Sequence, residues 1–260
     1  MINRNIYAEE LTLIRPEESF KACLCLCEFT TFANYKELAG FLHPQERKYY
    51  ETLKFEKRIK SYLFGRFAAK KAIATLIRDD NLTKTLIQAG IFNQPITTYE
   101  DKQNIQVSIS HCDNFGAAIA FPEVHPMGID IERINIEQNE AIERETTESE
   151  IKLIKELHFP YEKMLTILWT VKEALSKVLK TGLMTPFKIY EIDKIEIRHN
   201  YLLSFYKNFA QYKAISFIID DYICSITYPI KTELNINIHS INETFKYLSQ
   251  NKVLNYGETY

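Results

Sequence analysis

The amino-acid sequence predicts a mixed α+β protein. Two observations carry this prediction: short strand-like runs recur along the chain, and two long segments between them have apolar residues at helical spacing. Because strands and helices alternate, both are expected to build one layered architecture. The chain has 260 residues, 46% hydrophobic and 25% charged, which is typical of a folded protein with one large domain or two small ones.

The first half of the chain is expected to contain a strand, two helices and a hairpin. These elements are a strand at 20–29, a helix starting at 42–47, a longer helix from about 55 to 77, and a hairpin across 105–121. The hairpin is predicted by two strand-like runs with the turn-forming pair Asp113-Asn114 between them. In the longer helix, apolar residues form one stripe that is expected to be buried: Phe55, Ile59, Leu63, Phe67, Ile73 and Ile77.

A break in regular structure divides the chain near its middle. The segment FPEVHP at 121–126 contains two prolines, which interrupt both helices and sheets. The sequence therefore predicts two halves, residues 1–122 and 123–260.

The second half is expected to begin with a strand and to continue with helices and then more strands. The expected elements are a strand at 127–134, a helix through Leu157, a helix over Tyr161–Lys180, strands at 188–197, 201–206, 213–219 and 222–228, and an accessory tail from about residue 231. Thr147 and Glu150 form a capping-box pattern, which predicts where the first of these helices begins. Gly182 lies just beyond the end of the second helix, where glycine favours termination.

Charge and cysteine content limit the classes of partner and compartment. The net charge of −2 argues against attraction of the whole molecule to nucleic acid or to an anionic membrane. No signal peptide is recognisable at the start, and no run reaches the roughly 18 apolar residues of a membrane span. Five cysteines, an odd number, suit a reducing compartment, so we expect a cytoplasmic protein.

Three of these cysteines alternate within the first expected strand. Cys23, Cys25 and Cys27 would share one face, about 6.6 Å apart in a straight row, and a straight row does not close a tetrahedral metal site. We interpret them as small side chains buried on the core face of the strand.

Two carboxylates in MGIDIE form the first candidate site. Asp130 and Glu132 are two residues apart, so on a strand they point to the same face. Side by side they repel each other unless protons or a cation intervene, and oxygen ligands of this kind suit Mg²⁺. The pattern alone has low specificity, but these acids lie among residues that favour burial.

A glutamate and a lysine one turn apart form the second candidate. Glu173 and Lys177 have the order and spacing of an exposed helical ion pair, which is the simplest interpretation. In the functional interpretation, Glu173 reaches a metal from the helix and Lys177 holds a phosphate or protonates a leaving group. Trp169, one turn before Glu173, is interpreted as a packing residue.

Phosphate recognition is suggested by polar residues elsewhere. Ser110 and His111 end the first strand of the expected hairpin, where both side chains can donate hydrogen bonds to phosphate oxygens. They do not form a hydrolase triad, because adjacent strand residues face opposite ways and no GxSxG motif is present. One face of the long helix carries Arg58, Arg66 and Lys70. Such groups suit phosphate binding when several of them converge, although a basic helix face is more often a solvated surface. No glycine-rich phosphate loop is present. The acids, together with these hydroxyl, imidazole and basic groups, predict a Mg²⁺ and polyphosphate site in an α+β enzyme.

Four blocks, taken together, resemble the surfactin-synthetase type of 4′-phosphopantetheinyl transferase. They are GRFAAKKAI at 65–73, VSISH at 107–111, MGIDIE at 127–132 and WTVKEALSKVLKTGL at 169–183. The resemblance implies a pseudo-twofold pair of similar α/β subdomains, with coenzyme A in the cleft between them. The expected boundary at FPEVHP falls where the halves of that family join.

The resemblance also implies roles for individual residues. Asp130, Glu132 and Glu173 match the acids that bind Mg²⁺, with Mn²⁺ as a possible substitute, together with the coenzyme A pyrophosphate. The remaining matches concern coenzyme A itself. Lys177 matches a lysine near the phosphates, Lys172 matches its motif partner, and Ser110 and His111 match a pair that contacts the phosphates. Arg58 and Arg66 are looser matches for basic residues near the 3′-phosphate and adenine.

One position departs from the pattern of the family. Many members have Gly-Lys-Pro before the SISH strand, whereas this chain has Asn93-Gln94-Pro95. The lysine contact to phosphate would then be lost or supplied by Lys70 or Lys71, while Gln94 still donates a hydrogen bond to coenzyme A.

The implied reaction is attack of a carrier-protein serine on the β-phosphate of coenzyme A, with release of adenosine 3′,5′-bisphosphate. Glu173 is the expected general base and Lys177 stabilises the leaving phosphate. The expected partner is an acidic apo acyl, peptidyl or aryl carrier from fatty acid, polyketide or nonribosomal peptide synthesis, and the enzyme is expected to be a monomer. Two alternatives use the same residues: a Mg²⁺-dependent nucleotide pyrophosphate hydrolase, and an inactive module that binds coenzyme A or a carrier.

Overall fold

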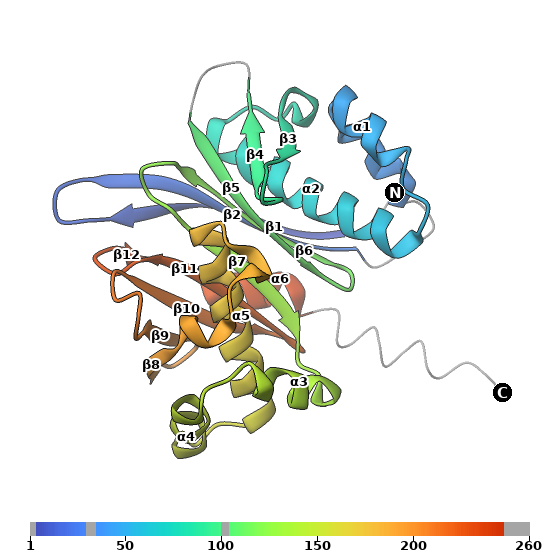
Figure 1. Ribbon diagram of the computed structural model, residues 1–260. Coiled ribbons are helices and arrows are strands. Elements are labelled where there is room, and N and C mark those ends of the chain that lie inside the picture. The colour runs from blue at the N-terminus through green and yellow to red at the C-terminus, as the bar shows by residue number, and fades with distance from the viewer. Residues whose placement is uncertain (1–3, 30–34, 100–103, 247–260) are drawn as a thin grey trace.

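Two five-stranded antiparallel sheets share one hydrophobic core, and each sheet is crossed on its other face by one long helix (Figure 1). The structure is a computed structural model that describes residues 4–29, 35–99 and 104–246. The order of the layers is therefore helix, sheet, sheet, helix.

The first sheet has the strand order β12-β1-β2-β6-β5. Its strands are β1 (Arg4–Ile14), β2 (Ser19–Phe29), β5 (Ile105–Cys112), β6 (Phe115–Pro122) and β12 (Glu233–Leu234). The expected hairpin over 105–121 is confirmed as β5 and β6, paired from Ile105 with Pro122 to Cys112 with Phe115. The sequence did not predict β1, which pairs with β2 along its whole length.

Helix α2 (Glu56–Ile77) covers the outer face of the first sheet. The predicted stripe is confirmed in its middle, where Leu63, Phe67 and Ile73 are buried, whereas Phe55 precedes the helix and is exposed. The helix ends where Arg78 takes a left-handed conformation, with φ of 59°. Three shorter elements lie in the same half: α1 (Pro44–Tyr50), β3 (Leu86–Ala89) and β4 (Pro95–Thr98).

Strand β2 is buried on both faces. Leu24 and Leu26 point into the core between the sheets, whereas Cys23, Cys25 and Cys27 point toward α2. The prediction that these cysteines are small core residues is confirmed, and all three are free thiols.

The second sheet has the strand order β7-β11-β10-β9-β8, and helix α5 (Tyr161–Leu179) packs against it. Its strands are β7 (Gly128–Arg133), β8 (Ile192–Ile197), β9 (Leu202–Tyr206), β10 (Tyr212–Ile219) and β11 (Tyr222–Pro229). Two short helices, α3 (Asn139–Arg144) and α4 (Glu148–Glu156), connect β7 to α5. The capping box of Thr147 and Glu150 is confirmed at the start of α4.

The two halves repeat one topology, which confirms the predicted pair of α/β subdomains. In each half, one strand is followed by a long helix and later by a hairpin whose second strand pairs with the first strand. These units are β2, α2, β5 and β6 in the first half, and β7, α5, β10 and β11 in the second.

The segment after residue 231 differs from the accessory tail expected from the sequence. Strand β12 pairs with β1 of the first half, and helix α6 (Ile238–Phe245) buries Ile238, Ile241 and Phe245 in the core that the sheets share. A two-residue strand carries no usable period, whereas the buried residues of α6 have the helical spacing i, i+3 and i+7, a signal that the sequence prediction did not use. The rest of the predicted tail, residues 247–260, lies outside the described residues. Among the described residues, no helix is long and apolar enough to cross a bilayer.

Candidate active site

The two halves meet where strand β5 of the first sheet lies beside strand β7 of the second. Two serine hydroxyl groups of β5 join the strands: Ser108 Oγ accepts a hydrogen bond from the amide of Ile129 at 3.0 Å, and Ser110 Oγ donates to Asp130 Oδ1 at 2.7 Å. The blocks VSISH and MGIDIE, which are separate in the sequence, are therefore in direct contact.

The acids of β7 face helix α5. Ile129 and Ile131 point into the core between the sheets, so Asp130 and Glu132 point to the opposite face, against which α5 packs. The prediction that the two acids share a face is thus confirmed. The side chain of Asp130 is buried, and its Oδ2 has no hydrogen-bond partner.

Lys177 reaches this face from α5. Its ammonium group donates to Asp130 Oδ1 at 2.7 Å and to the carbonyl oxygen of Ile129 at 2.9 Å. The ion pair with Glu173 that the spacing suggested is replaced by an ion pair with Asp130, 47 residues away in the chain. Lys177 is one quarter exposed, so it lies at the edge of the buried acids.

Burial and mutual repulsion perturb two of the three acids. Burial, followed by the charge of Asp130, raises the pKa of Glu132 to about 7 and that of Glu173 also to about 7. Lys177 partly opposes both shifts. Because Asp130 and Glu173 both raise the pKa of Glu132, the three carboxyl groups lie within electrostatic range of one another.

The donor chemistry of this cluster fits a hard divalent cation. It offers three carboxyl groups, and one buried Asp130 oxygen has no partner to satisfy it. The carboxyl groups are not preassembled into a cage: within the described parts of the chain, no group of three or more His, Cys, Asp or Glu side chains is arranged to hold a metal.

His111 is held by helix α2. Its Nε2 forms a hydrogen bond with the hydroxyl group of Ser61, and burial, followed by the charge of Lys177, lowers the pKa of the imidazole. The helix comes close to β5 at Gly65, where an added Cβ would lie 3.0 Å from Ile109 Cγ2. His111 therefore lies between two elements of the first half, near Asp130 of the second.

Two adjoining cavities flank the end of β5. One of about 280 Å³ has Gln94, Lys177, Lys180 and Gly182 in its lining. The other, of about 240 Å³, has Ser61, Tyr62, Arg66 and His111 in its lining. Asn93, Pro95 and Ile109 line both. The two cavities are thus contiguous, and Lys177, which lines the first, connects them to the acids through its ion pair with Asp130.

Several predicted coenzyme A ligands are placed differently by the structure. Lys70 and Lys172, which were predicted to contact coenzyme A, are both buried in ion pairs, with Glu46 and Glu150 respectively. A helical pattern fixes the spacing of lysines but not which of them point inward. Arg58 is exposed and lines neither cavity, whereas Arg66 lines the second cavity and lies 5.1 Å above the ring of Tyr62.

Two other residues at the site were missed in the sequence. Ser61 is a lone serine on a helix, and no local pattern connects it with His111. Cys112 follows the SISH block directly, and its thiol lies close enough to Glu132 to oppose the rise in the pKa of that carboxyl group. Its position at the end of the block was the only available signal.

Part of the chain is recognisably similar to a known family. Residues 126–227 match the family model described as the 4′-phosphopantetheinyl transferase superfamily. This match includes β7 and α5, so it contains Asp130, Glu132, Glu173 and Lys177.

A solved structure also matches part of this chain. A crystal structure of a holo-(acyl-carrier-protein) synthase from Bacillus anthracis str. Ames in complex with CoA (3′,5′-ADP) matches 43% of this chain and 96% of its own chain, with 17% identity and a TM-score of 0.34. No curated protein is significantly similar to this chain.

Proposed function

We propose that the protein transfers the 4′-phosphopantetheine arm of coenzyme A to a serine of an apo carrier protein. The observation that carries this proposal is the cluster of Asp130, Glu132, Glu173 and Lys177, which lies inside the segment that matches the transferase superfamily. The four-block resemblance extends the same assignment into the first half, where VSISH contacts the cluster directly.

Coenzyme A is proposed to lie along the two adjoining cavities. Arg66 and His111 in the second cavity suit the phosphates of the nucleotide, because guanidinium and imidazole groups donate directed hydrogen bonds to phosphate oxygens. The first cavity leads past Gln94 and Lys177, and its largely apolar lining suits the pantetheine arm. The side-chain oxygen of Gln94 accepts a hydrogen bond from the backbone amide of Phe92. In this proposal the side-chain nitrogen of Gln94 donates a hydrogen bond to coenzyme A.

Asp130, Glu132 and Glu173 are proposed to hold Mg²⁺, with Mn²⁺ as a substitute. The ion would neutralise charge on the pyrophosphate oxygens. Lys177 would donate to the phosphate that leaves with the adenosine, since it already lies against Asp130. Glu173 would accept the proton of the carrier serine as that oxygen bonds to the β-phosphorus and the bond to the bridging oxygen breaks. The products are the loaded carrier and adenosine 3′,5′-bisphosphate.

The test is to incubate the protein with coenzyme A, Mg²⁺ and a panel of apo acyl, peptidyl and aryl carriers, and to measure intact carrier mass. We expect one or more carriers to become heavier by the phosphopantetheine arm, and a carrier with its serine replaced by alanine to stay unchanged. Free phosphopantetheine with no loaded carrier would instead indicate a pyrophosphate hydrolase. Carrier binding without any product would indicate an inactive module.

The cytoplasmic location and monomeric state stay predictions.

A further inference from the structure

Two buried ion pairs, one from each half of the molecule, are built in the same way. In the first half, Glu46 Oε2 lies 2.7 Å from the Lys70 ammonium group, and Glu46 Oε1 accepts a hydrogen bond from the amide of Ile87 at 3.0 Å. Lys70 also donates to the carbonyl oxygens of Leu82, at 3.0 Å, and Thr85. One carboxylate therefore ties helix α1 to helix α2 and to strand β3.

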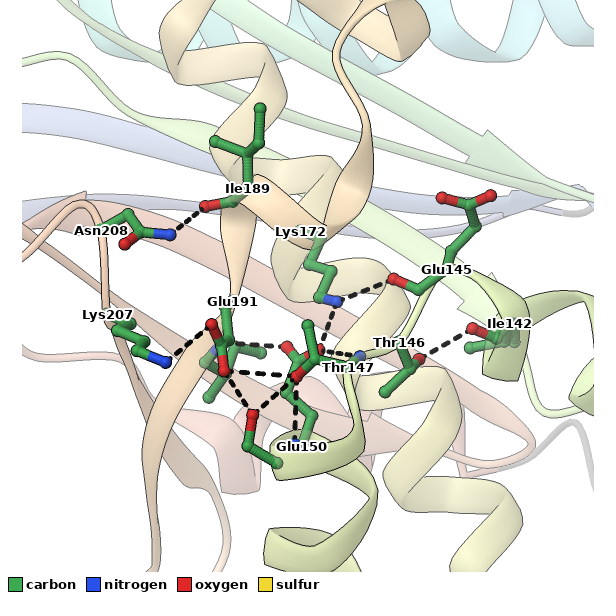
Figure 2. Close-up of polar contacts among 12 residues, drawn as sticks. Ile142, Glu145, Thr146, Thr147, Glu150, Lys172, Ile189, Glu191, Lys207 and Asn208 are labelled. Atoms are coloured by element: carbon green, nitrogen blue, oxygen red, sulfur yellow. Dashed lines mark hydrogen bonds and ion pairs between the residues drawn. The ribbon is translucent and has the colours of Figure 1, made fainter.

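The second half repeats this contact. Glu150 Oε2 lies 2.7 Å from the Lys172 ammonium group, and Glu150 Oε1 accepts from the amide of Ile192 at 2.9 Å. Lys172 also donates to the carbonyl oxygen of Glu145 at 3.2 Å, and Figure 2 shows its side chain extending from α5 toward both partners. The Glu150 carboxylate thus ties α4 to α5 and to β8.

The correspondence extends to the position of each group in its element. Both glutamates are the third helical residue of a capping box, begun by His43 in one half and by Thr147 in the other. Both lysines lie on the long helix of their half, and both amides belong to the strand that follows that helix. All four charged side chains are buried, so each pair is shielded from water and salt.

The second pair lies next to the acid cluster. Lys172 directly precedes Glu173 on α5, and its partner groups, Glu145 and Glu150, belong to the connection between β7 and α5. This connection joins the strand that carries Asp130 to the helix that carries Glu173. The pair therefore fastens α5, at the residue before Glu173, to the connection that leads from β7.

A second carboxylate reinforces this connection from outside. Glu191 accepts from the Thr147 hydroxyl at 3.3 Å and from the Lys207 ammonium group at 3.0 Å (Figure 2). It also accepts a hydrogen bond from the Ser149 hydroxyl. The start of α4 is thus held from both sides, by Glu150 and by Glu191.

The first pair lies next to the second cavity. Helix α2 carries Ser61 and Arg66 to the cavity wall, and strand β3 supplies Gln88, which follows Ile87. By tying α2 to β3, Glu46 and Lys70 fix the distance between two walls of the cavity proposed for the nucleotide.

We propose that these pairs are two positioning devices with separate kinetic roles. The Glu46–Lys70 pair sets the nucleotide-side cavity and therefore the affinity for coenzyme A. The Glu150–Lys172 pair sets Glu173 against the acids of β7 and therefore the rate of transfer. None of the four groups touches substrate, so all are positioning residues, and the inference rests on the proposed function.

The test uses double variants, because removal of one partner leaves an uncompensated buried charge that can unfold the protein. Lys172→Met/Glu150→Gln and Lys70→Met/Glu46→Gln each remove both charges and keep the volumes similar, and each serves as the matched control for the other. Thermal unfolding and circular dichroism check that both are folded. A single Lys172→Met variant is expected to be less stable than the corresponding double variant.

We expect opposite kinetic patterns in the carrier-loading assay. Lys172→Met/Glu150→Gln should lower kcat by about tenfold or more, with KM for coenzyme A nearly unchanged, because a small misplacement of a reacting group lowers turnover. Lys70→Met/Glu46→Gln should raise KM for coenzyme A by about tenfold, with kcat nearly unchanged. Identical patterns in the two folded variants, or no kinetic change in either, would overturn the proposal.

Binding measurements separate this inference from the proposed function. If the unsubstituted protein loads no carrier, the proposed function fails, and calorimetric titration with Mn²⁺ and with coenzyme A then tests the positioning. The proposal requires weaker Mn²⁺ binding only in Lys172→Met/Glu150→Gln and weaker coenzyme A binding only in Lys70→Met/Glu46→Gln. Unchanged affinities in both variants, or no binding of either probe to the unsubstituted protein, would overturn it.

Discussion

Gly128 begins strand β7 at a point where helix α5 passes directly over the backbone. A Cβ added at this glycine would lie 2.0 Å from the carbonyl oxygen of Ala174 and 2.9 Å from Val178 Cγ2. The carbonyl is helix backbone, so rotation of a side chain does not relieve the contact. Since Cβ atoms essentially never approach other atoms within 3.0 Å, Gly128→Ala requires α5 to retreat from β7 by about 1 Å.

This retreat is expected to affect both stability and activity. Overpacking of this kind costs about 1–3 kcal/mol, which lowers Tm by roughly 2–12 °C for a chain of this size. Glu173 lies next to Ala174 and moves with the helix, away from Asp130. A displacement of about 1 Å in a reacting group lowers the rate by up to roughly a hundredfold. Calorimetry measures the first effect, and initial rates of carrier loading at saturating coenzyme A measure the second.

Gly40→Ala is the matched control, because an added Cβ at Gly40 meets no atom within 4 Å. It removes the same conformational freedom from the unfolded chain without a collision, so its Tm should be equal to or above that of the unsubstituted protein. If Gly128→Ala retained both the original Tm and the original loading rate, the close approach of α5 to β7 and its importance for the acids would be refuted.

Three further predictions concern the metal, the pH and the last helix. Mg²⁺ should raise the Tm of the unsubstituted protein in proportion to ln(1 + [Mg²⁺]/Kd), but it should not raise the Tm of Glu173→Gln. This variant should fold normally and load carrier at a greatly reduced rate. An equal Mg²⁺-induced shift in Tm for both proteins would contradict the ligand role of Glu173. Burial lowers the pKa of His125 below its usual value of 6.5, so the unfolded chain takes up a proton first as the pH falls, and stability should decline below about pH 6.5. His125→Gln should reduce this decline in denaturant titrations, and an unchanged slope would refute it. Phe245→Ala should lower the free energy of unfolding by about 3–5 kcal/mol, because Phe245 is buried and its ring centroid lies 5.2 Å from that of Phe115. Glu243→Ala, on the exposed side of α6, should change this free energy little. Equal losses for the two variants would mean that α6 is not part of the core.

The local features of the chain followed from its sequence because they depend on neighbouring residues. The shared face of Asp130 and Glu132 follows from the two-residue repeat of a strand, and the capping box at Thr147 follows from a four-residue pattern. The two long helices, α2 and α5, were also predicted from the spacing of their apolar residues, whereas the two-residue β12 is too short to have a period.

Contacts between distant segments were not determined by such patterns. Lys177 has the spacing of an ion pair with Glu173, but packing of α5 against β7 brings it to Asp130 instead. Lys70 belongs to a row of basic residues that resembles a solvated face, but the tertiary structure buries it against Glu46. A row of basic residues on a helix has the same sequence whether its side chains point to water or to a buried carboxylate.

The sequence by itself determined the α+β class, the order of the main helices and strands, and the residue types of a site for a cation and phosphates. The tertiary structure decided which of those residues meet: Ser110 reaches Asp130 because the two sheets join at β5 and β7, and Lys177 reaches it because α5 packs against β7. It also decided that residues 233–245 belong to the core. The physical reason is that a periodic pattern records the local direction of side chains, whereas the site depends on how separate elements pack together.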